Sequence, residues 1–353
     1  MYYSAPYLAT GASDLLALRG DVSQASAFAT THLSKVSASD GGLIYRHFLG
    51  GHEDAMAKLD GLLDAIHKLL GNSADRIDET MLAYSSTEQA NLDEVEKLWE
   101  ALDNAPDIPP LGPPPDGGLT AGPLPSSGLA TPETNIGHWI FDVLSWPDYL
   151  SIGSWLRKIF GWIWQAVAGD DPWQMLWKWL GGDFEAIGLA AGAWQELGDW
   201  FDDMAGELGV RMQIMFGGWY DSTDATAAGS YFAQATQAIA AAEGPMDDLF
   251  RLYNDVAWSS YGFFQAIYSL IDAAIDALVA TLMGGTSVLE AIAAVFSGGA
   301  TAVPAAASAI IAAVETLSAA WGYMMTAVYG VVGIGALVGA ATTQIEWVAI
   351  PEG

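Results

Sequence analysis

The sequence predicts an all-α protein in which long antiparallel helical hairpins form an elongated bundle, with a Pro-rich linker and an apolar C-terminal helical hairpin. Three observations predict this fold: two stretches where apolar residues recur at helical steps, glycines that interrupt those steps, and a run of prolines that excludes a helix. The expected units are an N-terminal hairpin over 1–104, a linker over 105–136, a Trp-rich helical segment over 137–185, and a final unit over 186–353 that holds a second hairpin and the apolar helices.

The second hairpin is predicted over residues 193–239. Its first helix carries apolar residues at three- and four-residue steps, which places their side chains on one face. The pattern is cut at the glycines 217–218, which are poor helix formers, and Trp219 follows at the elbow. Ser222 or Asp224 can cap the returning helix. The apolar stripe consists of Trp194, Leu197, Phe201, Met204, Leu208, Met212 and Met215.

The N-terminal hairpin is predicted from helical spacing over residues 13–36 and 53–102. The SASDGG turn and a break at residues 50–51, both glycine, separate the two helices. Near the end of the second helix, Tyr84 and Glu88 are four residues apart and therefore share a helical face. By itself this spacing is equally typical of a half-buried Tyr beside a solvated Glu. The apolar face of the second helix consists of Met56, Leu59, Leu62, Leu63, Ile66, Leu69 and Leu70.

Two segments between the hairpins have unusual compositions. Residues 106–132 are rich in Pro and Gly, so we expect an extended, mobile linker with neither helix nor sheet. The following segment, 137–185, is rich in Trp, which is typical either of an aromatic cover packed on long helices or of a belt at a membrane interface. Packing is the favoured interpretation, because only Arg157, Lys158 and Lys178 are available there to an anionic surface.

The C-terminal part contains two apolar runs, over residues 288–314 and 316–345. The second is long enough to span a bilayer core of about 30 Å. Glu290 and Glu315 are the only charged residues between Asp276 and Glu346, and protonation of these two carboxylates in acid would favour membrane insertion.

A small-xxx-small pair, Gly335 and Gly339, lies within the second apolar run. Such pairs let two helices approach closely, in a protein core or in a membrane. Ala and Gly dominate both runs and no basic residue flanks them to set an orientation. A buried helical hairpin is therefore the favoured interpretation, and conditional entry into a membrane is the alternative.

Composition and charge exclude several classes of protein. The chain has 353 residues, with 12 Lys and Arg against 42 Asp and Glu, for a formal net charge of −30. Such a charge repels phosphate backbones and anionic membrane surfaces, so we expect no nucleic-acid partner. The absence of Cys excludes disulfides, thiol nucleophiles and thiolate metal sites. The first residues lack the basic start and apolar run of a cleaved secretory signal, so export would need another route.

Candidate catalytic and metal-binding residues are scarce. His47 and His52, with Glu53 beside the second, form the one conceivable metal cluster. A five-residue step does not share a helical face, and two glycines lie between the histidines, so a metal role is disfavoured. The glycine-rich run 333–339 follows no predicted strand, which favours helix packing over nucleotide binding. We therefore predict a protein that is not an enzyme and has no cofactor, metal or catalytic residues.

Two stretches resemble known components of one secretion system. Residues 173–283, with the elbow at Trp219, resemble the Trp-x-Gly helical-hairpin family of actinobacterial type VII (ESX) secretion substrates. Tyr220 and Asp221 follow Trp219, so Asp stands where the family has Gly. Residues 43–102 resemble the small helical secretion targets that carry Tyr-x-x-x-Asp/Glu, because the sequence from Tyr84 to Glu88 reads Tyr-Ser-Ser-Thr-Glu.

The resemblance implies a composite export signal formed by Tyr84, Glu88 and Trp219, which a secretion ATPase or a chaperone recognises. In two-protein substrates the two halves lie on partner chains, whereas here both are in one chain, so the N-terminal hairpin is expected to dock antiparallel along the Trp219 hairpin. The implied product is a secreted or cell-surface, non-enzymatic helical interaction or scaffold protein, with homo-oligomers and membrane contact left open. The alternative is a membrane-active pore-forming or conduit protein that uses the apolar C-terminal helices.

Overall fold

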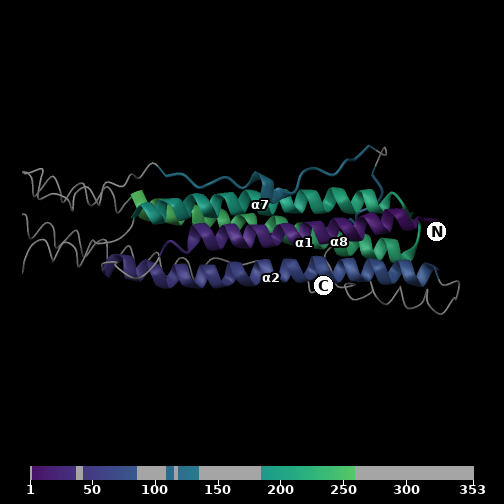
Figure 1. Ribbon diagram of the computed structural model, residues 1–353, viewed down its shortest axis with the longest axis horizontal. Helices are drawn as coiled ribbons and strands as arrows, with labels where there is room; N and C mark the ends of the chain where they lie inside the picture. Colours follow the sequence, from purple (N-terminus) through teal and green to yellow (C-terminus); the bar gives the residue numbers. More distant parts are fainter. Residues whose placement is uncertain (1, 37–42, 86–108, 115–117, 135–183, 259–353) are drawn as a thin grey trace, which may run out of the picture.

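The computed structural model describes residues 2–36, 43–85, 109–114, 118–134 and 184–258. Within these ranges the chain is mostly helical, which confirms the all-α class. Figure 1 shows the long helices aligned along the longest axis of the molecule, as an elongated bundle.

Several predictions fall outside the described residues. They concern Glu88, the Trp-rich segment 137–185, the apolar runs 288–314 and 316–345, and the pair Gly335 and Gly339. Of the helices that the structure does describe, none is both long and apolar enough to cross a membrane.

Two helical hairpins make up the described bundle. The first consists of α1 (Ala5–Leu33) and α2 (Leu43–Ser85), and the second of α7 (Phe184–Phe216) and α8 (Thr223–Ala241). A further helix over 243–258 continues the direction of α8 after a turn at the intervening residue. Helix α1 packs against both α2 and α7, so it joins the two hairpins (Figure 1).

The first hairpin differs from its prediction at two points. Helix α1 begins at Ala5 rather than at residue 13, because Pro6 suits the first turn, where a backbone N–H needs no helical partner. Helix α2 runs through Gly50 and Gly51 without a break, so the predicted break is wrong. Each glycine costs about 1 kcal/mol of helix propensity, but the packing of a long apolar face on α1 outweighs that cost.

The core is continuous between the two hairpins. Every residue of the apolar stripe predicted on α7 is buried, and so is the α2 face from Leu59 to Leu70, apart from the partly buried Met56 at its start. The stripe prediction is thus confirmed. The largest fully buried side chains include three tryptophans, Trp194, Trp200 and Trp219. Burial of this much apolar surface provides the main favourable term in folding.

The elbow of the second hairpin combines a tight turn with a short strand. Helix α7 ends at Phe216, two glycines follow, and Trp219–Tyr220 form β2. Ser222 then caps α8, since its hydroxyl accepts a hydrogen bond from the Ala225 N–H at 3.1 Å. Of the two cap candidates, the structure therefore selects Ser222, which leaves the Asp224 carboxylate free for another contact.

The N-terminus adds a strand that the sequence analysis did not predict. Tyr2–Tyr3 form β1, which pairs antiparallel with β2 in the register Tyr2 to Tyr220 and Tyr3 to Trp219. The first residues of the chain are thus fixed at the elbow. Strands of two residues are too short to leave a periodic signal in a sequence.

Much of the Pro-rich linker lies against the bundle instead of moving freely. We call residues 118–134 the strap; it includes the short 3-10 helix η2 (Pro125–Gly128) and runs beside α7 (Figure 1). Carboxylates on the helices accept its backbone N–H groups. The Gly122 N–H donates to Glu207 at 3.1 and 3.0 Å, the Ala130 N–H to Glu196 at 2.8 Å, and the Ser126 N–H to Asp21 at 3.1 Å. The expectation of a mobile linker is wrong for the strap, because these hydrogen bonds satisfy the backbone of a segment that forms no regular ladder.

A buried arginine ties the strap to both hairpins. Arg211 on α7 is 7% exposed and forms ion pairs with Asp14 of α1 at 2.7 Å and with Glu207 at 3.1 Å. Its remaining nitrogen donates to the Gly122 carbonyl of the strap at 2.9 Å. A buried guanidinium needs such partners, since an unpaired charge would carry a large desolvation penalty.

Candidate functional site at the elbow

Residues from four elements meet at the elbow site, which we define as Tyr3, Tyr84, Trp219 and Asp224. They come from β1, α2, β2 and α8, respectively. The Trp219 indole is fully buried, and its Nε1–H donates to the Tyr84 hydroxyl oxygen at 3.3 Å. The Tyr84 hydroxyl in turn donates to Asp224 Oδ2 at 2.7 Å. A chain of hydrogen bonds therefore links α2 of the first hairpin to β2 and α8 of the second.

Aromatic rings pack around this chain of hydrogen bonds. The rings of Tyr3 and Tyr84 meet edge to face, with centroids 4.8 Å apart, and those of Tyr84 and Trp219 do so at 6.4 Å. Phe216, at the end of α7, stacks on Trp219 at 5.8 Å. These separations lie within the range at which aromatic pairs stabilise a fold beyond the area that they bury. The elbow site is thus a rigid contact between the two hairpins.

The electrostatics of the site keep Tyr84 protonated. Burial, followed by the hydrogen bond to Asp224, raises the pKa of the Tyr84 hydroxyl well above its ordinary value of 10.0, while donation from Trp219 acts in the opposite direction. Asp224 lies in the first turn of α8, where the positive end of the helix dipole favours a carboxylate. The neutral phenol and the charged acceptor therefore form a charge-assisted hydrogen bond.

Asp221 has the backbone conformation expected of a glycine. It is the one residue other than glycine with a positive φ, 64°, among those that the structure describes. This is the left-handed region, which Asp tolerates better than most residues because its short side chain can hydrogen-bond locally. The chain therefore turns at this position without a glycine.

The structure brings together two of the three residues assigned to the export signal, Tyr84 and Trp219, while Glu88 lies outside the described residues. Sequence reasoning missed Tyr3 at this site and considered Asp224 only as a helix cap. No sequence signal could have identified Tyr3, since its place depends on strand pairing with a segment more than 200 residues away.

Of the candidate metal cluster, the structure describes the side chains of His52 and Glu53, whereas that of His47 lies outside the described residues. His52 is 4% exposed, its Nδ1 lies 2.6 Å from the Tyr253 hydroxyl, and its Nε2 lies 3.1 Å from the Leu33 carbonyl oxygen. Burial lowers the pKa of His52 to about 4, so the ring is neutral near pH 7. Glu53 is exposed, and among the described residues no group of three or more His, Cys, Asp or Glu is arranged to hold a metal ion. His52 instead joins α2 to the helix over 243–258.

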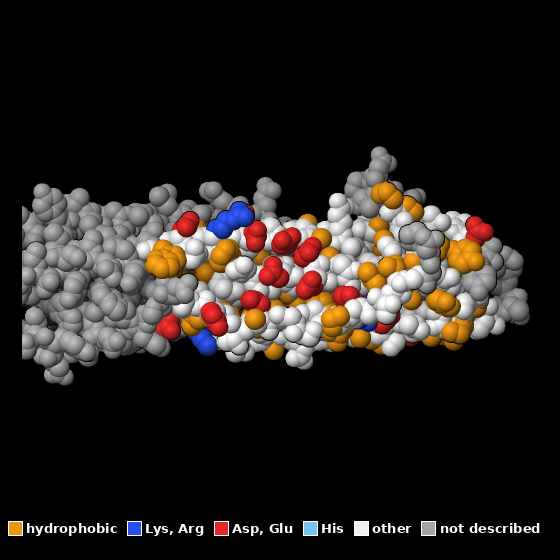
Figure 2. All heavy atoms as spheres, turned by 90° about the horizontal axis from the view of Figure 1, so that it is seen from above, with side chains coloured by type: hydrophobic (Ala, Val, Ile, Leu, Met, Phe, Trp, Pro, Cys, Tyr) orange, Lys and Arg blue, Asp and Glu red, His pale blue; other side chains and the backbone are white. Residues whose placement is uncertain are grey.

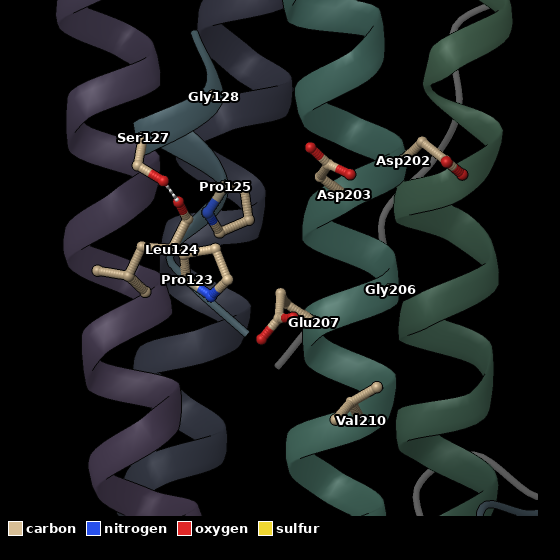
Figure 3. Close-up of a pocket in the computed structure, with 10 residues that line it drawn as sticks. All are labelled: Pro123, Leu124, Pro125, Ser127, Gly128, Asp202, Asp203, Gly206, Glu207 and Val210. Atoms are coloured by element: carbon tan, nitrogen blue, oxygen red, sulfur yellow. Dashed lines mark hydrogen bonds between the residues drawn. The ribbon is translucent and has the colours of Figure 1, made fainter. Parts of the chain in front are cut away.

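The groove between the strap and α7 has a volume of about 400 Å³ (Figure 3). Asp203 and Glu207 of α7 lie on one side and Pro123 to Gly128 of the strap on the other. Its lining combines acidic side chains of α7 with Pro, Leu, Ser and Gly of the strap and contains no His.

Acidic side chains gather on the face formed by α7 and the helix over 243–258, seen as red groups in Figure 2. Burial, and then repulsion from neighbouring carboxylates, raises the pKa of Asp199 and that of Glu243. Like charges this close oppose one another, and such a surface repels phosphate groups.

Comparison of the chain with protein-family models, curated proteins and solved structures finds no match.

Proposed function

We propose that this protein is a secreted type VII (ESX) secretion substrate that acts as a non-enzymatic helical interaction or scaffold protein. The single observation that supports the proposal most is the contact between Trp219 and Tyr84, which unites within one chain two of the three residues that the resemblance assigns to a composite export signal. The left-handed backbone at Asp221, where the family has Gly, is consistent with the same type of elbow. A secretion ATPase or a chaperone would recognise this end of the bundle.

The test is export of variants from an actinobacterial host that performs type VII secretion. Tyr84→Ala and Trp219→Ala should abolish the protein in the culture filtrate while it accumulates in the cytosol. Truncation of a buried Trp costs about 3–5 kcal/mol, so each cytosolic variant must first be shown to be folded by circular dichroism and thermal unfolding. Folded variants that reach normal levels in the filtrate would refute the proposal.

Conservative variants separate the signal from mere stability. Tyr84→Phe keeps the ring but removes the hydroxyl, with a loss of about 1.5–3 kcal/mol for a hydrogen bond to a charged group. Trp219→Phe removes the indole N–H and keeps an aromatic side chain. Trp258→Phe serves as a matched control, because Trp258 is 45% exposed and lies outside the elbow site. We expect the first two to reduce export and the control to be exported normally.

The second candidate is a membrane-active protein, favoured by one observation: the sequence over 316–345 is long and apolar enough to span a bilayer. Flotation of the full chain with liposomes, with dye release measured at neutral and acidic pH, tests this function. Binding and release in acid would favour a pore or conduit, whereas the absence of binding at both pH values would leave the scaffold function.

A further inference from the structure

The surface that a partner can contact at the elbow does not include Trp219. Trp219 is 0% exposed, and Tyr3 and Tyr84 are half-buried against the core. Opposed residues of an antiparallel pair place their side chains on the same face, and successive residues alternate between faces. The pair Tyr3 and Trp219 thus occupies the inner face of the ribbon, and Tyr220 occupies the outer face with Tyr2 as its register partner. Accordingly, Tyr220 is 38% exposed.

A second exposed tyrosine adjoins this outer face. Tyr7, in the first turn of α1, is 45% exposed and packs so closely on Gly218 that a Cβ added at Gly218 would lie 2.3 Å from Tyr7 Cβ. Gly218 directly precedes β2, so Tyr7 contacts the chain two residues before Tyr220. Pro6, next to Tyr7, is also exposed. We define Pro6, Tyr7 and Tyr220 as the outer elbow patch; Figure 2 shows hydrophobic side chains at this end of the bundle.

The charges around the outer elbow patch are predominantly negative. Asp221 is exposed beside Tyr220, and Asp78 and Glu79 are exposed on α2, six and five residues before Tyr84, or about 9 Å along the helix. Arg76 is partly exposed three residues before Glu79, but no Lys or Arg occurs in α8 or between Glu79 and the end of α2. A second copy of the chain, with the same acidic rim and a formal charge of −30, would be repelled here. Charge complementarity instead fits a basic partner.

We propose that the outer elbow patch is the contact surface for a protein partner with an apolar pocket rimmed by Lys or Arg. This inference rests on the proposed function, because it assigns to Trp219 and Tyr84 the role of positioning the ribbon and to Tyr7 and Tyr220 the role of direct contact. Exposed tyrosines suit the second role, since they bury a large rigid surface at low entropic cost and are enriched among interface hot spots.

The test compares exposed and buried positions of the full chain in the export assay. The double variant Tyr7→Ser with Tyr220→Ser should fold as the parent does and should be exported about tenfold less or worse, as expected when hot-spot side chains are lost. Restoring aromatic rings with Tyr7→Phe and Tyr220→Phe should recover most of the export. Leu16→Ser is the matched control, because Leu16 is 49% exposed on α1 and outside the patch.

A charge arm tests the chemistry of the partner. Asp78→Lys with Glu79→Lys should reduce export. The control pair, Glu53→Lys with Asp60→Lys, makes the same change of charge at exposed positions nearer the start of α2 and should not reduce export. Equal effects of the two pairs would overturn the assignment of a basic partner.

The outcomes distinguish this inference from the proposed function. Normal export of the Tyr7 and Tyr220 double variant, with loss of export in Tyr84→Ala and Trp219→Ala, would overturn the contact surface and leave the proposed function standing. Normal export of all folded variants would refute both. Sedimentation that reveals a dimer, dissociated by the Tyr220→Ser substitution, would assign the patch to a second copy and would also overturn the proposal.

Discussion

Substitution of Asp21 should release the strap from the bundle. The Asp21 side chain is buried on α1 and accepts hydrogen bonds from the Ser126 N–H at 3.1 Å, from the Ser126 hydroxyl and from Trp200 Nε1 at 2.9 Å. One carboxylate therefore satisfies donors from the strap and from α7 at once. Asp21→Ala removes the acceptor from all three donors, whereas Asp21→Asn keeps one oxygen acceptor.

The magnitude follows from these contacts. A buried donor left without an acceptor costs about 1–3 kcal/mol, and removal of one partner from a buried charged network costs about 3–5 kcal/mol. We expect Asp21→Ala to lower the free energy of unfolding by about 3–5 kcal/mol. Asp21→Asn should lower it by about 1–2 kcal/mol, because the amide oxygen still accepts a hydrogen bond but lacks the negative charge that strengthens it. A loss of 3 kcal/mol or more corresponds to an increase of about a hundredfold in the population with the strap open.

Native-state proteolysis with thermolysin measures that population, since cleavage within 118–134 requires local opening of the strap. The rate of cleavage should rise in the order parent, Asp21→Asn, Asp21→Ala. Asp60→Ala, an exposed substitution on α2, is the control and should change stability by less than about 0.5 kcal/mol. Cleavage of Asp21→Ala at the rate of this control would show that Asp21 does not hold the strap.

Two further predictions concern pH and the elbow turn. Because burial lowers the pKa of folded His52 to about 4 from 6.5, the unfolded state binds the proton first, and about 3 kcal/mol of stability should be lost as the pH falls from about 6.5 to about 4. The free energy of unfolding in urea, measured from about pH 6.5 to about pH 4, should fall less for His52→Gln than for the parent protein. An equal fall for the two proteins would contradict the prediction. Gly218→Ala should destabilise the elbow, since its Cβ would meet Tyr7 at 2.3 Å, whereas Gly206→Ala, with open space around the added Cβ, should stabilise α7 by about 0.5–1 kcal/mol. Equal melting temperatures for the two alanine variants would refute the steric argument.

Helical class and core faces could be predicted because they depend on local periodicity. The stripe from Trp194 to Met215 is buried as expected, and the elbow lies at Trp219 as its preceding glycines indicated. The break predicted at Gly50 and Gly51 is absent, because helix continuity there depends on packing with residues distant in the sequence. Glycine is a local penalty of about 1 kcal/mol, and packing along the full length of α2 is a larger, nonlocal gain.

The strap shows a second limit of local patterns. A Pro-rich composition indicates that the strap has no α-helix or strand, and its one regular element is the short η2, but composition does not reveal whether acceptors elsewhere will satisfy the backbone N–H groups. Asp21, Glu196 and Glu207 do so here, and in the sequence they resemble any solvated acid on a helix.

The amino-acid sequence by itself determined the helical class, the apolar faces of α2 and α7, the turn before Trp219 and the strongly acidic charge, since these depend on composition and on neighbouring residues. Only the tertiary structure decided that Trp219 contacts Tyr84 and Asp224 bonds Tyr84, that Tyr3 pairs with the elbow, and that the strap is held in place. These contacts join residues more than 60 positions apart. They form when hydrophobic burial brings the two hairpins together, and no periodicity within a short window specifies them.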